Sequence, residues 1–334
     1  SLRIDGSTWV VEPEPSIDEL RVNAAGEAGY WSGAVKSIIK ETEDLTVLYQ
    51  VSSKKRNLAN KSGFTRWSDP LLSPDDVGVT GESLKPRLAA FLEVNRKDGE
   101  SLVLPDRIRA ERLAWQPKPK LEFFVDFETV NSLKDTFTNF PEQSGQDLIF
   151  MIGCGHIENG KWQFECFITE RLTESKEALI IDQWFEHMNA VQTRLDPGNK
   201  ANIYHWSAAE VNFLQKSSNS AYNRHPDNNW PDPNWFDFYQ RVMREEPVVV
   251  RGAHGFGLKA ITKALNKLNL IDIDWPDGTT DGLGAMAGAW WCDEQAELQG
   301  NSLTDYELME DIRAYNEIDC KAMHEIISYM RIKH

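Results

Sequence analysis

The stretch Phe123–Thr129, which reads FFVDFET, decides the fold because it places two carboxylates in an otherwise apolar strand. Alternate residues of a strand share one face, so Asp126 and Glu128 point the same way while Val125 and Phe127 point into the opposite core. Two acids at the end of an apolar strand are costly to remove from water unless a cation lies between them. A divalent metal ion is the natural partner, and a solvated strand end is the alternative.

Further strands follow this stretch along the chain. Leu148–Ile157 is a second apolar strand, and Trp162–Thr169 is a third with cleaner alternation of apolar and polar residues. Asn159 and Gly160 between them predict a tight hairpin turn. Two shorter strands are expected at Asn202–Trp206 and Trp235–Phe238.

Helical patterns alternate with the later strands. They cover Glu174–Val191, Ala208–Lys216, Leu258–Leu268, Gly284–Trp291 and Asp305–Ile332. Strands joined by hairpins, followed by alternating helices and strands, predict an α/β domain with a mixed five-stranded sheet and helices on both faces.

The sequence pattern changes from helical to strand-forming at Pro117–Lys120, a short Pro/Lys segment that we interpret as a linker. Residues 1–116 predict a small, mainly helical domain, and residues 121–334 predict the α/β domain. The helical stretches of the first domain are Ile17–Ala28, Gly33–Thr42, Leu45–Lys61 and Ser83–Asn95.

Composition places the chain among ordinary globular proteins, with 334 residues, 41% of them hydrophobic and 26% charged. No apolar run approaches the roughly 18 residues of a membrane span, and the first residues contain no apolar signal core. We therefore expect a cytoplasmic protein without a membrane partner, and its start suggests a fragment of a longer chain. The 4 cysteines form no C-x-x-C pair, so we expect buried thiols.

The net charge of -16 predicts a surface that repels polyanions. This argues against an architectural nucleic-acid binder. It argues less against a nuclease, since divalent cations in a carboxylate-lined site invert the local potential where phosphate must lie.

Two later segments add acids to the strand-borne pair. Glu210 lies in the first turn of a helix that follows the aromatic strand at 202–206, where an acid also favours the helix dipole. Tyr315 and Asp319 lie four apart, on one face of the last long helix. Each segment alone has a structural explanation, as an N-terminal acid or a packed Tyr–Asp pair.

Together the three segments resemble the exonuclease motifs of the DEDD superfamily of ribonuclease H-like 3′–5′ exonucleases. They occur in the same order and on the same elements, with D-x-E on a strand, an acid at a helix start and Y-x-x-x-D on the last helix. Residues 121–332 look like the YprB-type domain found beside RecB-family nuclease modules, a likeness that extends to Phe236–Phe238 and Gly257–Lys259.

The resemblance implies a ribonuclease H-like fold and two-metal phosphodiester hydrolysis with Mg²⁺ or Mn²⁺. Asp126, Glu128 and Asp319 would hold one ion, and Asp126 with Glu210 the other, while Tyr315 would orient the attacking water and help to deprotonate it. The superfamily's histidine branch has His five residues before the last Asp, where this chain has Ala314, so the tyrosine branch matches. Glu210 departs from the usual Asp and could weaken the second metal site.

Other candidate residues give weaker evidence of a functional role. The glycine pairs at Gly153–Gly155 and Gly252–Gly257 complete no phosphate-binding loop, and we interpret them as turns. His205 and His254 could approach the site or serve in packing. Asp237 could support a metal ligand or cap the next helix.

Two further features could serve nucleic-acid binding or structure alone. A tryptophan cluster could stack single-stranded bases, though core packing is the stronger expectation; it comprises Trp230, Trp235, Trp275, Trp290 and Trp291. Residues 45–69 look like a degenerate helix-hairpin-helix element with Ser52 and Ser53 in place of glycines.

Two functions of different classes follow. The first is a metal-dependent 3′–5′ exonuclease acting on a free, single-stranded 3′ end of DNA or RNA. The second is a nuclease-like domain that has lost catalysis and binds nucleic acid or serves as a scaffold within a larger RecB-type protein. The presence of all four acids and the tyrosine favours the first.

Overall fold

The computed structural model describes residues 10, 15, 17, 20–26, 31–96, 101–131, 147–217, 219–275 and 282–334. The chain forms two compact units. The first comprises residues 1–105 and 247–264, and the second comprises residues 106–246 and 265–334. Residues 117–120 lie within the second unit. That they act as a linker, and that residues 121–334 fold alone, stay predictions.

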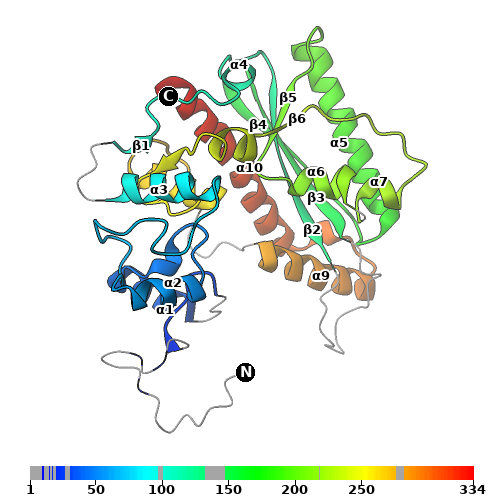
Figure 1. Cartoon of the computed structure of the whole chain (residues 1–334). Coiled ribbons are helices and arrows are strands. Elements are labelled where there is room, and N and C mark those ends of the chain that lie inside the picture. Colours follow the sequence, from blue (N-terminus) through cyan, green and yellow to red (C-terminus); the bar gives the residue numbers. More distant parts are fainter. Residues whose placement is uncertain are drawn as a thin grey trace. The chain divides into compact units, whose positions relative to one another are not determined.

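The second unit is built on a mixed five-stranded sheet in the order β4-β3-β2-β5-β6 (Figure 1). Its strands are β2 (Glu122–Val130), β3 (Leu148–Glu158), β4 (Lys161–Ile168), β5 (Asn202–His205) and β6 (Trp235–Asp237). Strands β2, β3 and β4 pair antiparallel, whereas β5 and β6 run parallel to β2. The predicted α/β architecture is confirmed.

The turn between β3 and β4 shows how local sequence sets the strand register. Asn159 and Gly160 adopt φ angles of 52° and 74°, the left-handed region that a two-residue hairpin of this kind requires. Glu158 then pairs with Lys161 across the turn. The predicted hairpin is confirmed.

Helices cover both faces of the sheet (Figure 1). On one face, α5 (Glu174–Leu195) buries Trp184 against Phe123, Val125 and Phe127 of β2. On the other face lie α9 (Gly282–Gln299) and α10 (Glu307–Lys333). The remaining elements of this unit are short: α4 (Arg112–Trp115), α6 (Ala209–Val211), η5 (Asn212–Lys216), α7 (Ala221–Arg224), η6 (Tyr239–Met243) and η7 (Leu303–Asp305).

The alternation of β2 decides where the carboxylates lie. Its odd-numbered residues from 123 to 127 belong to the core beneath α5, so its even-numbered residues face α10. Phe124 accordingly packs edge-on against His324 of α10, with ring centroids 5.2 Å apart. Asp126 and Glu128 therefore share one face of the strand, as the sequence predicts, and this face lies against the last helix.

The first unit is mainly helical and has its own core. It contains α1 (Ser32–Thr42), η4 (Leu45–Val47), α2 (Ser53–Lys61) and α3 (Leu84–Asn95). A short antiparallel pair joins β1 (Val103–Leu104) to β7 (Val249–Val250), which brings residues 247–264 into this unit. Helix α8 (Leu258–Lys267) follows β7.

Two of the helices that the sequence predicts in the first unit are wrong, because the structure does not form them over the predicted residues. The stretch Leu45–Lys61 splits in two because Gln50 is left-handed, with φ of 62°, and Ser52 caps a new helix by accepting a hydrogen bond from Lys55 N. The described part of Ile17–Ala28, residues 17 and 20–26, contains no α-helix: Leu20 has a 3₁₀ conformation, and the residues after it form bends, turns and irregular structure. There the Asn23 side chain accepts a hydrogen bond from Ala25 N, which competes with helix formation.

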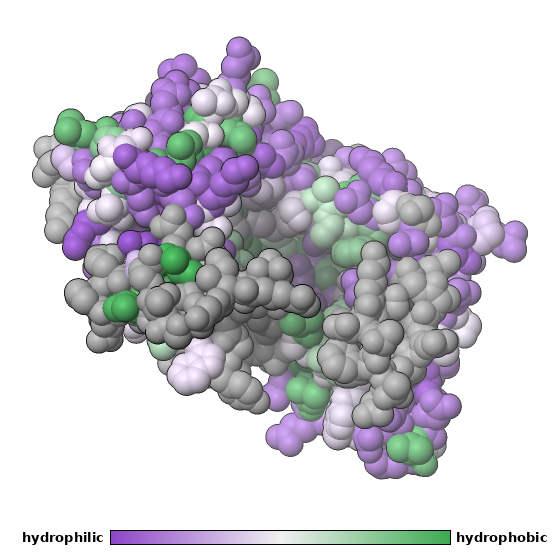
Figure 2. Space-filling model, turned by 60° about the horizontal axis from the view of Figure 1, so that its bottom comes forward, coloured by the Kyte–Doolittle hydropathy of each residue, from purple (hydrophilic) through white to green (hydrophobic). Residues whose placement is uncertain are grey.

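Exposed apolar residues are scattered. On the face shown in Figure 2, small hydrophobic areas are separated by hydrophilic ones. The most exposed large apolar side chains come from several different elements, namely Trp31, Leu71, Leu113, Leu298 and Ile332. No helix among the described residues has the length and apolar character needed to cross a membrane.

Candidate active site

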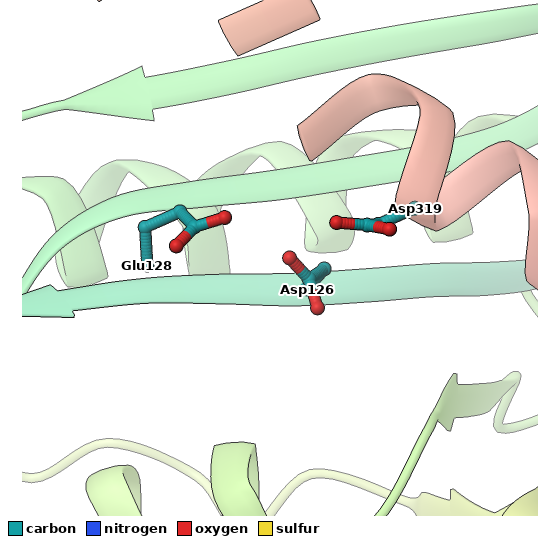
Figure 3. Close-up of side chains that lie close together, drawn as sticks. All are labelled: Asp126, Glu128 and Asp319. Atoms are coloured by element: carbon teal, nitrogen blue, oxygen red, sulfur yellow. The ribbon is translucent and has the colours of Figure 1, made fainter. Parts of the chain in front are cut away.

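Three carboxylates converge where β2 faces α10 (Figure 3). Asp126 and Glu128 project from the same face of β2, and Asp319 approaches from α10. One oxygen from each carboxylate lies within 4.8 Å of the others. Glu128 and Asp319 are buried, and Asp126 is half-buried. The structure thus brings together three of the four predicted metal ligands.

The electrostatics of this cluster favour a bound cation or a bound proton. Burial raises the pKa of Asp126 well above its usual value, and the neighbouring charges of Asp319, Glu128 and Glu210 raise it further. A hydrogen bond from Asn316 acts in the opposite direction on the same pKa. Oxygen donors from carboxylates are the ligands that Mg²⁺ and Mn²⁺ prefer, so the donor set fits such an ion.

Glu210 is near the cluster without belonging to it. It lies in α6, directly after β5, and its side chain is buried. Its charge acts on Asp126, but the group of three carboxylates within 4.8 Å does not include it. His205 at the end of β5 holds it, with Nδ1 3.2 Å from a Glu210 carboxylate oxygen. His205 therefore contacts a predicted ligand and does not join the cluster itself.

Tyr315 lies one helical turn before Asp319 and is 7% exposed. Burial raises the pKa of its hydroxyl, and so do the charges of Asp319, Glu128 and Asp126 and a hydrogen bond to Asp319. The phenol therefore stays protonated at neutral pH and donates to Asp319.

Sequence reasoning missed Asn316, which lies beside Tyr315 in the same motif. Its side chain is fully buried, and its amide nitrogen donates to Asp126 Oδ2 at 2.8 Å and to the Asp126 carbonyl oxygen at 3.2 Å. Asn316 thus fixes the orientation of the central carboxylate.

Gly153 provides the space for Asn316. It lies opposite Asp126 in the β2–β3 register, and a Cβ at this position would come within 1.8 Å of Asn316 Oδ1. The interpretation of Gly153–Gly155 as a turn is wrong, because both glycines lie inside β3. Glycine within a strand marks a close approach of another element, and that signal could have located α10.

We predict that Gly153→Ala weakens metal binding at the site as well as lowering the stability of the fold. Overpacking should cost about 1–3 kcal/mol and push Asn316 away from Asp126, so stabilisation by Mn²⁺ should fall. Gly155→Ala is the matched control, since the three nearest atoms that a Cβ there would meet all belong to Trp162, the first at 2.1 Å. Thermal denaturation with and without Mn²⁺ compares them; an equal metal response in the two variants would contradict the assignment.

The remaining candidates lie outside the carboxylate cluster. Asp237 Oδ1 accepts hydrogen bonds from Gln240 N at 2.8 Å and Ser207 N at 3.3 Å, so it acts as a cap. Of the tryptophan cluster, Trp291 is 50% exposed and Trp235 half-buried, whereas three are buried in cores: Trp230, Trp275 and Trp290. His254 belongs to the first unit.

Comparison with protein families identifies the architecture. The model of the RNase H superfamily matches residues 124–331, which span β2 to α10. The chain belongs to the RNase H superfamily. Neither the curated proteins nor the solved structures gave a match. Nucleases of this superfamily act on nucleic acid with divalent metal ions, and the acidic cluster on β2 and α10 agrees with nuclease-type activity.

Proposed function

We propose that this protein is a metal-dependent 3′–5′ exonuclease that hydrolyses single-stranded ends of DNA or RNA. The observation that carries the proposal is the convergence of Asp126, Glu128 and Asp319 from two elements far apart in sequence. Glu210 and Tyr315 lie close enough to influence this cluster. From the sequence we also propose a cytoplasmic location, and from the family resemblance we propose RecB-type partner modules.

The three clustered carboxylates fit a divalent ion, Mg²⁺ or Mn²⁺, and we propose a second ion beside Glu210. Asp126, Glu128 and Asp319 would hold one, and Asp126 with Glu210 the other. When bound, such ions acidify the attacking water and stabilise the leaving oxygen. His205 keeps the longer Glu210 side chain in place by bonding its carboxylate, which offsets the freedom of the extra methylene.

The other side chains position the reacting groups. Asn316 fixes Asp126, and the protonated Tyr315 hydroxyl is placed to orient water at the Asp319 side of the cluster. In the DEDD resemblance Tyr315 also helps to deprotonate the water. The raised pKa of Tyr315 favours the orienting role.

The substrate prediction follows from the acidic surroundings of the site. A flexible single strand can thread its 3′ end to the carboxylates without the cost of opening base pairs. With Mn²⁺, a 5′-labelled single-stranded oligonucleotide should therefore give a descending ladder on a denaturing gel, and a blunt duplex should react more slowly. DNA and RNA versions of the same oligonucleotide decide between the two substrates.

A closed circular single strand is the control, because it offers no 3′ end. Cleavage of the circle at the rate of the linear strand would indicate an endonuclease. No cleavage of any strand, with Mn²⁺ still raising the melting temperature, would favour the catalytically inactive binding module.

A further inference from the structure

Charge is divided unequally between the two units. The first unit holds as many Lys and Arg residues as Asp and Glu residues, so the whole net charge of -16 falls on the second unit. Two stretches contain no acidic residue, namely 45–68 and 247–271. The first stretch carries Lys54, Lys55, Arg56, Lys61 and Arg66, and the second carries Arg251, Lys259, Lys263 and Lys267.

The two acid-free stretches meet inside the first unit. The rings of Trp67 and His254 lie with centroids 4.8 Å apart, and those of Tyr49 and Phe256 lie 5.2 Å apart. Trp67 is half-buried, with one part packed against the core of this unit. The pair Trp67–His254 is therefore held rigidly while part of the indole remains accessible.

This aromatic pair lines a cavity of about 610 Å³. One face of α1 forms another wall, with Val35 and Ile39 as apolar contacts and Lys36 and Lys40 beside them. All lining residues in the described part of the chain belong to the first unit. The volume falls within the usual range for a small organic ligand.

The polar groups of the cavity favour an anionic ligand. Lys36 and Lys40 are exposed, lie one helical turn apart and form no ion pair with other described residues. Glu43, the acid among the described lining residues, is already engaged by Arg66 at 3.7 Å and by the Ser68 hydroxyl. Among these described residues, the positive charges without an ion pair therefore exceed the negative ones.

His254 adds a second aromatic ring to the lining of the cavity. Burial lowers the pKa of His254 to about 4, so the ring is neutral at pH 7. A neutral ring can lie against the face of a nucleobase beside Trp67 without the cost of burying a charge.

We propose that this cavity binds a nucleotide of single-stranded nucleic acid, with the base against Trp67 and His254 and the adjoining phosphates on Lys36 and Lys40. An aromatic platform beside basic side chains is the combination that single strands require. The site lies outside the carboxylate cluster and shares with the proposed function only the class of substrate.

The first test measures binding of a fluorescein-labelled oligo(dT) 20-mer by the full chain in EDTA, so that metal-bound carboxylates do not contribute. Lys36→Gln/Lys40→Gln should weaken binding several-fold and reduce the slope of log K against log salt by about 1.4, since each single-strand phosphate contact contributes about 0.7. Lys161→Gln/Lys333→Gln removes the same charge from exposed positions of the second unit and should leave the slope nearly unchanged. Equal slopes in both double variants would overturn the proposal.

The second test addresses stacking. Trp67→Ala should raise the Kd about tenfold to a hundredfold, whereas Trp67→Phe should retain much of the affinity. Because Trp67→Ala could impair folding, Trp67→Phe also serves in a fluorescence experiment. Oligo(dT) should quench wild-type tryptophan emission more than that of Trp67→Phe, and identical quenching would overturn the proposal.

These outcomes are distinguishable from failure of the exonuclease proposal. The lysine and tryptophan variants should keep Mn²⁺-dependent cleavage at saturating substrate, because none of these residues lies at the carboxylate cluster. Binding in EDTA that depends on Trp67 and Lys40, without cleavage under any metal, would leave the cavity assignment standing and remove the nuclease assignment. Binding of free dTMP as tightly as the 20-mer would show a mononucleotide site instead and contradict the strand proposal.

Discussion

Asp126→Asn should abolish nuclease activity, with kcat at least about a thousandfold lower. Asp126 is the carboxylate that the proposal shares between both metal ions, and loss of metal stabilisation amounts to several kcal/mol of the barrier. The substitution keeps the size of the side chain and its place on β2. Product release from a single-stranded oligonucleotide, with Mn²⁺ at saturation, measures the effect.

The same variant should lose the metal-dependent rise in melting temperature. Without metal, the raised pKa of Asp126 means that its contribution to stability is greatest at low pH and is lost as the pH rises through that value. Metal ions relieve the repulsion and compete with protons, so stabilisation by Mn²⁺ should be larger at pH 8 than at pH 5.5. Calorimetry at both pH values, with Mn²⁺ or EDTA, tests this.

Asp311→Asn is the matched control for Asp126→Asn, since Asp311 is an exposed acid on α10. It removes the same charge without touching the cluster and should leave both activity and metal response intact. A metal-dependent rise in Asp126→Asn equal to that of the wild type would rule out Asp126 as a ligand.

Short-range sequence patterns predicted the strands of the sheet and the shared face of the two carboxylates on β2. Alternation along β2 required only the chemistry of neighbouring residues, and Asn159–Gly160 determined the β3–β4 register through backbone conformation alone. The Y-x-x-x-D spacing placed Tyr315 and Asp319 on one face of α10 in the same way. Each of these features depends on residues close together in the chain.

Contacts between residues far apart in the chain could not be predicted from local sequence patterns. Asn316 and Asp126 are separated by 190 positions, and no periodicity links them. Residues 247–264 join the first unit through ring contacts with distant residues and through the pairing of β7 with β1, two strands of two residues each. Such short strands contain too few residues to show alternation.

The other large effect concerns Tyr315, and Tyr315→Phe should lower kcat by about a hundredfold. Acid–base or orienting help of this kind is typically worth about 10²–10⁴-fold, and the lower end applies because bound metal already acidifies the water. The substitution retains the buried aromatic ring at position 315. Only one hydrogen bond, worth about 1 kcal/mol, is lost, so the melting temperature should fall by only about 2–4 °C.

Comparison with Asp319→Asn separates the chemistry of the hydroxyl from the structure of the metal site. Asp319→Asn removes a member of the carboxylate cluster and should therefore cost both activity and stabilisation by Mn²⁺. Tyr315→Phe leaves the three carboxylates in place, so it should cost activity while the response to Mn²⁺ persists. If Tyr315→Phe were fully active under conditions in which Asp319→Asn is inactive, the hydroxyl would have no part in orienting water. Its hydrogen bond to Asp319 would then serve only to hold the Asp319 carboxylate in position on α10.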